Sequence, residues 1–283
     1  MFKNMTDFLT GAEYLRHAYK IPTVSLALPL PDEPFVSKWQ AAPGREALAF
    51  LADEFKLPVF GFVWQRQSDL SISFATTLGG RLPVIATGCH EDFRSMEALL
   101  NGRNESRELP VTVNAFTMQA RAGNIFRHRL LLLNRAPYSN VPAERLGLTD
   151  DDWLERSHRL RLRHECTHYE TLRLLSGMKN HALDEILADA LGQIAAFGNF
   201  DADRQRIFFG LEKGKETCTG RLSFYCRKVA VEERPKVYLA VDEVLGEVAN
   251  EVRSMIDRKA TNWEILAAMA GKSIAERLSH REG

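Results

Sequence analysis

Six short apolar runs divide the first half of the chain. Each is rich in β-branched, leucine or aromatic residues and has the length of one strand. The runs cover residues 23–28, 59–64, 71–75, 83–86, 111–116 and 126–133. Over residues 45–55 and 91–100 the apolar positions instead recur at helical spacing. This alternation predicts a mixed α/β region built on a small sheet, with a hairpin turn at residues 121–124 before the last strand.

The second half of the chain carries helical spacing with clear helix boundaries. Thr149 precedes three aspartates, which is the pattern of an N-cap followed by an acidic first turn. The helix that begins there can run to about residue 176, where Gly177 supplies a stop. Asn180 is then expected to cap a second helix that reaches about residue 197 and ends at Gly198. Later helices are expected over residues 237–259 and 262–279.

These elements predict an α+β fold with two lobes. Residues 1–140 form an N-terminal mixed α/β lobe with a small sheet, and residues 141–283 form a mainly helical C-terminal lobe. A chain of 283 residues can bury a large core, and the sequence contains no repeat or long flexible linker. We therefore expect one functional unit with a cleft between its lobes.

The first long helix of the C-terminal half contains the sequence HExxH, formed by His164, Glu165 and His168. Residues four apart lie on adjacent turns of one helical face, so both imidazoles can reach one ion. Zinc binds neutral imidazole nitrogen readily. Glu165 lies about 100° round the helix from His164, where it can approach a water molecule as a general base instead of binding the metal. The motif therefore predicts a zinc site that activates water.

The helix around this motif is amphipathic, which strengthens the prediction. Charged residues at positions 155, 159, 163, 170 and 173 share one side, and both histidines lie on the opposite side with Trp153 and Leu160. Two adjacent buried imidazoles need hydrogen-bond partners, and one ion satisfies both. The alternative is a pair of core histidines bonded to the backbone or to a carboxylate.

The next helix supplies a second acidic pair, Glu185 and Asp189, one turn apart on a face with small residues around it. Glu185 is placed to be the third metal ligand. Asp189 can accept a hydrogen bond from the outer nitrogen of a ligating histidine and so fix its tautomer. Asp184 points about a quarter-turn away from Glu185 and is the weaker ligand candidate. The alternative is that these carboxylates are solvated helix charges.

At this point the chain resembles the zincin metallopeptidases of the gluzincin type, in which a helix bearing HExxH is followed by a helix bearing ExxxD. The matching residues are His164, Glu165 and His168, then Glu185 and Asp189. The resemblance covers about residues 150–197. It implies zinc ligation by His164, His168 and Glu185, catalysis by Glu165, and support of a ligand by Asp189. By analogy with zincins, residues 111–116 or 126–133 could provide the strand edge that binds substrate.

Charge and composition narrow the classes of partner. The 37 basic residues are matched by 37 acidic ones, which argues against nucleic-acid binding and against a polybasic membrane attachment. Residues 1–7 are mixed polar, and no stretch approaches the roughly 18 apolar residues needed to span a bilayer. Four scattered cysteines without CxxC spacing fit reduced thiols. We therefore expect a soluble protein kept in the cytoplasm.

The pattern as a whole predicts a zinc-dependent hydrolase that cleaves a peptide or protein amide bond. Two alternatives remain: a zincin-like binding or regulatory protein without turnover, and a zinc hydrolase of a non-peptide amide or ester. Zincins need a donor for the oxyanion of the transition state, and Arg161, His181 and Tyr225 are candidates. For each of these three, a structural or solvent-facing role is the simpler interpretation.

Overall fold

A computed structural model describes residues 9–279. Residues 1–8, on which the expectation about targeting partly rests, lie outside the described residues. Contacts divide the chain into two compact units. The sheet unit is Val24–Ser176, and the helical unit combines residues up to Thr23 with those from Gly177 onward. This grouping puts the HExxH helix with the sheet, whereas the expected boundary at residue 140 put it with the later helices.

The sheet unit is built on four strands in the order β1-β2-β4-β3. Their bounds are Ser71–Thr77 (β1), Gly80–Thr87 (β2), Ala115–Gln119 (β3) and Arg129–Asn134 (β4). β1 pairs antiparallel with β2, and β3 antiparallel with β4. β2 and β4 run parallel, with Val84 opposite Leu131. β3 is therefore an edge strand, and β4 lies inside the sheet.

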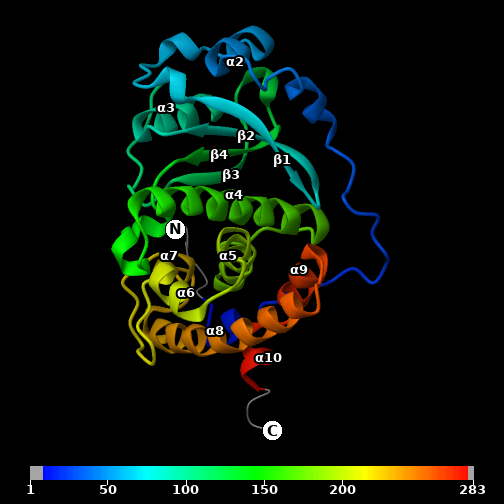
Figure 1. The fold of residues 1–283 in the computed structure, drawn as a ribbon, viewed down its shortest axis with the longest axis vertical. Helices are drawn as coiled ribbons and strands as arrows, with labels where there is room; N and C mark the ends of the chain where they lie inside the picture. The colour runs from blue at the N-terminus through cyan, green and yellow to red at the C-terminus, as the bar shows by residue number, and fades with distance from the viewer. Residues whose placement is uncertain (1–8, 280–283) are drawn as a thin grey trace, which may run out of the picture. The chain divides into compact units, whose positions relative to one another are not determined.

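Helices cover both faces of this sheet (Figure 1). Because side chains alternate along a strand, Leu130 and Leu132 pack into one core with helices α2 (Ala47–Phe55) and α3 (His90–Leu100). Leu131 and Leu133 pack on the opposite face. There they meet Cys166 and Tyr169 of helix α4 (Asp150–Leu174), which runs along the sheet. The sheet unit thus has three layers, with α4 as one of them.

The helical unit contains the remaining α-helices of the described residues. Their bounds are Gly11–Leu15 (α1), Ala182–Phe197 (α5), Ala202–Phe209 (α6), Leu222–Tyr225 (α7), Arg234–Asp257 (α8), Asn262–Ala270 (α9) and Ile274–Ser279 (α10). Every residue of α5 from Ala182 to Gln193 is buried. The buried set includes its acidic residues Asp184, Glu185 and Asp189. The alternative that these carboxylates are solvated helix charges is therefore wrong.

Short 3-10 helices connect the longer elements. They cover Pro34–Trp39, Val59–Gly61, Gln67–Asp69, Gly123–Ile125, Tyr138–Asn140, Ala143–Leu146 and Val231–Glu233. Among the residues that the structure describes, none of the helices has the length and apolar character that crossing a bilayer demands.

The α+β fold class is confirmed, with the sheet in the N-terminal half and a mainly helical C-terminal part. Two of the six predicted strands are absent. Residues 23–28 are irregular, and residues 59–64 form a 3-10 turn and a loop in which Phe60 is 90% exposed. The run predicted over 111–116 becomes a strand only from Ala115, because a turn occupies its start. The last expected helix is broken near Gly271 into α9 and α10.

Candidate metal centre

Helix α4 brings the two histidines of the HExxH motif together. Thr149 caps this helix as predicted, its hydroxyl accepting the N–H of Asp152. The Nε2 atoms of His164 and His168 lie 3.0 Å apart, and both side chains are buried. Two donor atoms on one tetrahedral zinc, each about 2.0–2.1 Å from the ion, are separated by about 3.3 Å. The observed separation is close to that value, so the pair can serve as two ligands of one ion with a small adjustment.

The outer nitrogen of His164 has a defined partner. The Tyr138 hydroxyl lies 2.9 Å from His164 Nδ1. When Nδ1 carries the proton and donates to this hydroxyl, Nε2 is the unprotonated nitrogen, which is the form that can bind a metal. Tyr138 is itself held, because its backbone N–H donates to Ser157 on α4. The sequence pattern assigned the support of a ligating histidine to Asp189 and missed Tyr138, which begins a short 3-10 helix without a recognisable motif.

Glu165 points toward the edge strand of the sheet. The Thr117 hydroxyl on β3 lies 2.6 Å from Glu165 Oε2 and 3.0 Å from the Glu165 carbonyl oxygen. The Glu165 side chain is buried. A carboxylate that accepts a hydrogen bond from a fixed hydroxyl is held in one orientation, which a general base requires. Thr117 lies one residue beyond the apolar run predicted over 111–116. The sequence did not predict its contact with Glu165, because the strand lies further along the chain than the predicted run.

Arg161 has a structural role. Its guanidinium donates to the backbone carbonyls of Asn134, Ala136 and Pro137, and it lies over the ring of Tyr138. These bonds fix the segment that carries Tyr138 against α4. The contacts of Arg161 therefore agree with the simpler, structural interpretation of this residue.

In the helical unit, Glu185 and Asp189 share one cation. Arg221 Nη1 lies 3.3 Å from Glu185 Oε2, and Arg221 Nη2 bonds to Asp189. Gln205 donates a further hydrogen bond to Asp189. Two buried carboxylates one turn apart repel each other unless a positive charge lies between them. Arg221 supplies that charge, and no motif pointed to it because it lies 32 residues beyond Asp189.

A tight crossing of two glycines precedes Arg221. Gly210 ends α6 with a left-handed φ of 72°, and Gly220 passes directly over it. A Cβ atom on Gly220 would lie 2.6 Å from the carbonyl oxygen of Phe209, which is closer than real contacts allow. The crossing therefore needs glycine at both positions. It sets the direction from which Arg221 reaches the two carboxylates of α5.

Tyr225 on α7 lies in the surroundings of Glu185. Burial is the main reason that the pKa of the Tyr225 phenol is raised well above its usual value of 10, and the Glu185 carboxylate raises it further. Tyr225 therefore stays protonated and can act as a hydrogen-bond donor. Of the three suggested oxyanion donors, His181 caps α5, Arg161 binds backbone carbonyls, and the Tyr225 side chain is hydrogen-bonded to Glu185.

The predicted residues thus form two groups. His164, Glu165 and His168 belong to the sheet unit, together with Tyr138 and Thr117. Glu185 and Asp189 belong to the helical unit, together with Arg221. The two histidines, Glu165, Glu185 and Asp189 are all buried, and each makes a hydrogen bond or an ion pair within its own unit. The assembly of both groups around a common ion stays a proposal.

A family model described as a family of unknown function (DUF7005) matches residues 114–279. The match covers more than half of the 283 residues. The chain belongs to this family. The matched span begins next to β3 and includes Thr117, the HExxH helix, Glu185, Asp189 and Arg221. No curated protein and no solved structure matches the chain.

Proposed function

We propose that this protein is a zinc-dependent metallopeptidase. The observation that carries the proposal is that His164 Nε2 and His168 Nε2 lie 3.0 Å apart on one helix. Glu165, which follows His164 in the sequence, accepts a hydrogen bond from the Thr117 hydroxyl. This combination provides two metal ligands and a fixed general base on one helix. His164, His168 and Glu185 hold the zinc, a donor set of two imidazoles and one carboxylate that is typical of catalytic zinc sites.

Zinc held by His164, His168 and Glu185 would supply a Lewis acid that lowers the pKa of a bound water molecule to about 7. Glu165 accepts the proton of the attacking water and later delivers it to the leaving nitrogen, so one carboxylate serves both halves of the reaction. Tyr225, protonated and near Glu185, donates a hydrogen bond to the developing oxyanion. Tyr138 and Arg221 orient a ligand from each unit.

The substrate is an extended peptide that pairs with the free edge of β3. Within the described sheet, β4 is the one strand paired with β3, so the other edge of β3 offers backbone N–H and C=O groups. Thr117 on this strand contacts Glu165, which brings a bound peptide next to the general base. Of the two runs suggested by analogy, β3 lies at the edge, whereas residues 129–134 form the internal strand β4.

The compartment belongs to the proposal as well. The four cysteines, Cys89, Cys166, Cys218 and Cys226, are free thiols in the structure. Free thiols fit a reducing environment, and we place the enzyme in the cytoplasm. A peptidase in that compartment acts on a restricted peptide or protein target.

A metal-removal experiment tests this function. The protein is stripped of metal with a chelator and reloaded with zinc, and its hydrolysis of a peptide library is measured in both states. We expect no cleavage by the stripped protein and restoration by one zinc equivalent at the His164 site. Zinc uptake without cleavage of any peptide would contradict the proposal and favour a binding protein. Cleavage of amide or ester compounds alone would favour a non-peptide hydrolase.

Replacing Thr117 with valine removes the hydroxyl that holds Glu165. We expect kcat to fall about tenfold with KM little changed, because substrate binding does not use this hydroxyl. Zinc content should stay at the wild-type level. Thr117→Ser keeps the hydroxyl and should restore most of the rate.

The matched control for Thr117 is Thr76→Val, at an exposed position of β1. It should leave kcat unchanged. If Thr117→Val had full activity, or if Thr117→Ser were as slow as Thr117→Val, the positioning role would be wrong.

Arg221→Met removes the guanidinium that contacts the buried carboxylates of Glu185 and Asp189. We expect metal-free protein to lose about 3 kcal/mol of unfolding free energy, as when one partner of a buried ion pair is removed. Zinc-loaded protein should lose less, because the ion then offsets the charge of Glu185. Urea unfolding with and without zinc measures both values.

Arg159→Met is the control for Arg221, because it breaks an exposed pair with Glu155 on α4. Its cost should stay below about 1 kcal/mol, with or without zinc. An equal loss for Arg221→Met in both metal states would show that Glu185 does not meet the ion.

A further inference from the structure

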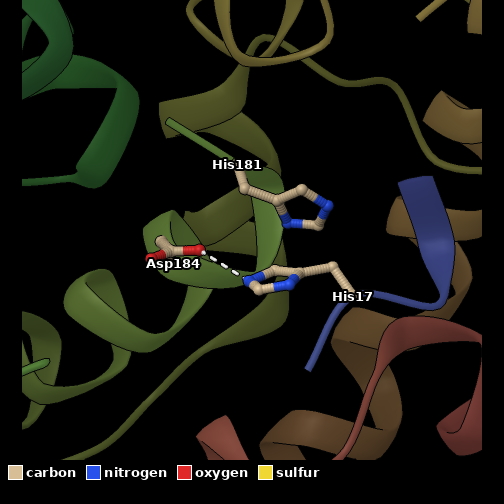
Figure 2. A group of neighbouring side chains, drawn as sticks. All are labelled: His17, His181 and Asp184. Atoms are coloured by element: carbon tan, nitrogen blue, oxygen red, sulfur yellow. Dashed lines mark ion pairs between the residues drawn. The ribbon is translucent and has the colours of Figure 1, made fainter. Parts of the chain in front are cut away.

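A second cluster of metal-binding side chains lies in the helical unit, away from the HExxH motif. It consists of His17, His181 and Asp184, each offering one ligand atom, and these atoms all lie within 4.8 Å of one another. Figure 2 shows the two imidazoles one above the other, with the Asp184 carboxylate beside them. His17 follows α1, whereas His181 and Asp184 open α5. The cluster therefore joins two segments that are far apart in the sequence.

The contact between His17 and Asp184 has the geometry of two ligands that lack their ion. His17 Nε2 lies 3.6 Å from Asp184 Oδ2, marked by the dashed line in Figure 2. That distance is too long for a hydrogen bond and close to the separation of about 3.3 Å between two ligands on one tetrahedral zinc. Both atoms are buried, and neither has a hydrogen-bond partner among the described residues.

The other carboxylate oxygen of Asp184, Oδ1, accepts two hydrogen bonds. The Tyr19 hydroxyl and the backbone N–H of Lys179 both donate to Oδ1, the second over 3.1 Å. These two bonds fix the carboxylate and leave Oδ2 directed toward His17. A buried carboxylate oxygen that is fixed in place and accepts no hydrogen bond is costly, and a metal cation would reduce that cost.

His181 can provide the third ligand through its Nδ1. Its Nε2 donates to the Tyr14 carbonyl oxygen over 2.8 Å, so Nδ1 is the unprotonated nitrogen. Nδ1 accepts the backbone N–H of Leu183 over 3.0 Å as the N-cap of α5. Burial lowers the pKa of His181 to about 4, so the ring is neutral, as a metal ligand must be. Binding an ion through Nδ1 exchanges this one cap bond for a coordinate bond.

The Lys179 ammonium lies next to the cluster. It lies 3.3 Å from His17 Nδ1, on the side of the ring opposite Asp184. Metal binding at Nε2 leaves the proton on Nδ1, so this ammonium has to move away. The Lys179 side chain is exposed and can do so without disturbing the core.

We infer that His17 Nε2, His181 Nδ1 and Asp184 Oδ2 form a second site for a divalent transition metal such as zinc. Two imidazoles and a carboxylate suit such an ion better than calcium or magnesium, which prefer oxygen ligands. The bound ion would tie the segment after α1 to the first turn of α5. Because Glu185 follows Asp184 directly, the ion would also fix the start of the helix that carries the proposed catalytic ligand.

The test uses full-length protein in which His164 and His168 are both alanine, so the proposed catalytic site contributes no signal. Calorimetric titration of this variant with zinc alone should give about one equivalent, and cobalt should give the visible absorption of a tetrahedral site. Adding His17→Ala should abolish both signals. His17 is partly exposed, so this change should leave the fold intact, as circular dichroism can verify.

The control replaces His90, a histidine of the sheet unit, with alanine in the same background and should retain one equivalent. Zinc should also raise the Tm of the His164/His168 double variant but not that of the triple variant with His17→Ala. If the double variant took up no zinc, or if His17→Ala left uptake unchanged, the second site would be refuted. No zinc uptake would instead identify His17 and Asp184 as a simple ion pair. These outcomes do not depend on whether the HExxH helix catalyses hydrolysis.

Discussion

Glu165→Gln is expected to abolish peptide hydrolysis while leaving zinc bound. The amide keeps the size of the carboxylate and can still bond to the Thr117 hydroxyl, but it cannot take a proton from water. Loss of a general base typically costs 10² to 10⁴ in rate, so we expect kcat to fall about 10³-fold, or about 4 kcal/mol of transition-state stabilisation. Zinc content and KM should stay near the wild-type values, because Glu165 is not a ligand.

The control for this substitution is Glu155→Gln, which makes the same chemical change on an exposed part of α4. Its kcat should be that of the wild type. Wild-type turnover in Glu165→Gln would remove the general base from the mechanism. Loss of zinc from Glu165→Gln would instead place Glu165 among the ligands.

His168→Ala is expected to lose both turnover and the zinc of the HExxH site. Structural zinc sites with four ligands bind with about 10–16 kcal/mol, which is about 3 kcal/mol for each ligand. Removal of one imidazole should therefore weaken zinc binding about 100-fold or more. His164→Ala should behave in the same way, although it also removes the hydrogen bond between His164 Nδ1 and the Tyr138 hydroxyl. Competition with a chelator of known affinity measures the change.

His158→Ala is the matched control, because His158 also lies on α4 but belongs to neither proposed site. Burial lowers the pKa of His158, so this histidine is neutral too and shares that property with a ligand. Zinc affinity should stay at the wild-type value. Equal losses in His158→Ala and His168→Ala would show that α4 as a whole, and not the HExxH pair, supports metal binding.

The sequence predicted well what depends on local geometry. The start of α4 at Thr149 follows from capping, and the meeting of His164 with His168 follows from the helical repeat of 3.6 residues. β1 and β2 were found because their apolar runs are bounded by turn residues. These features need no knowledge of distant parts of the chain.

The sequence-based prediction that one side of α4 is charged and exposed to solvent was partly wrong. Arg163 and Glu170 were placed with the charged residues opposite the histidines, yet Glu170 is 1% exposed. Arg163 makes two bonds of 2.8 Å to Glu170, which also accepts the backbone N–H of Leu78. An internal ion pair looks like a solvated charge pair in sequence. The prediction assumed one buried face, whereas the sheet buries a second face through Cys166 and Tyr169.

Residues that act on the site from other segments could not be predicted. Tyr138 lies in a short 3-10 helix before α4, Thr117 lies on an edge strand, and Arg221 follows a loop closed by two glycines. Each reaches its partner through tertiary packing, which leaves no fixed spacing in the sequence. The cap of α5 was misplaced by one residue for a related reason, because His181 and not Asn180 accepts the N–H of Leu183.

Anomalous diffraction at the zinc absorption edge, from crystals of the zinc-loaded protein, would locate the ion directly. We expect a peak within about 2.3 Å of three atoms: His164 Nε2, His168 Nε2 and a carboxylate oxygen of Glu185. A zinc-loaded crystal with no peak between the two imidazoles, or with Glu185 remote from that peak, would refute the proposed zinc centre.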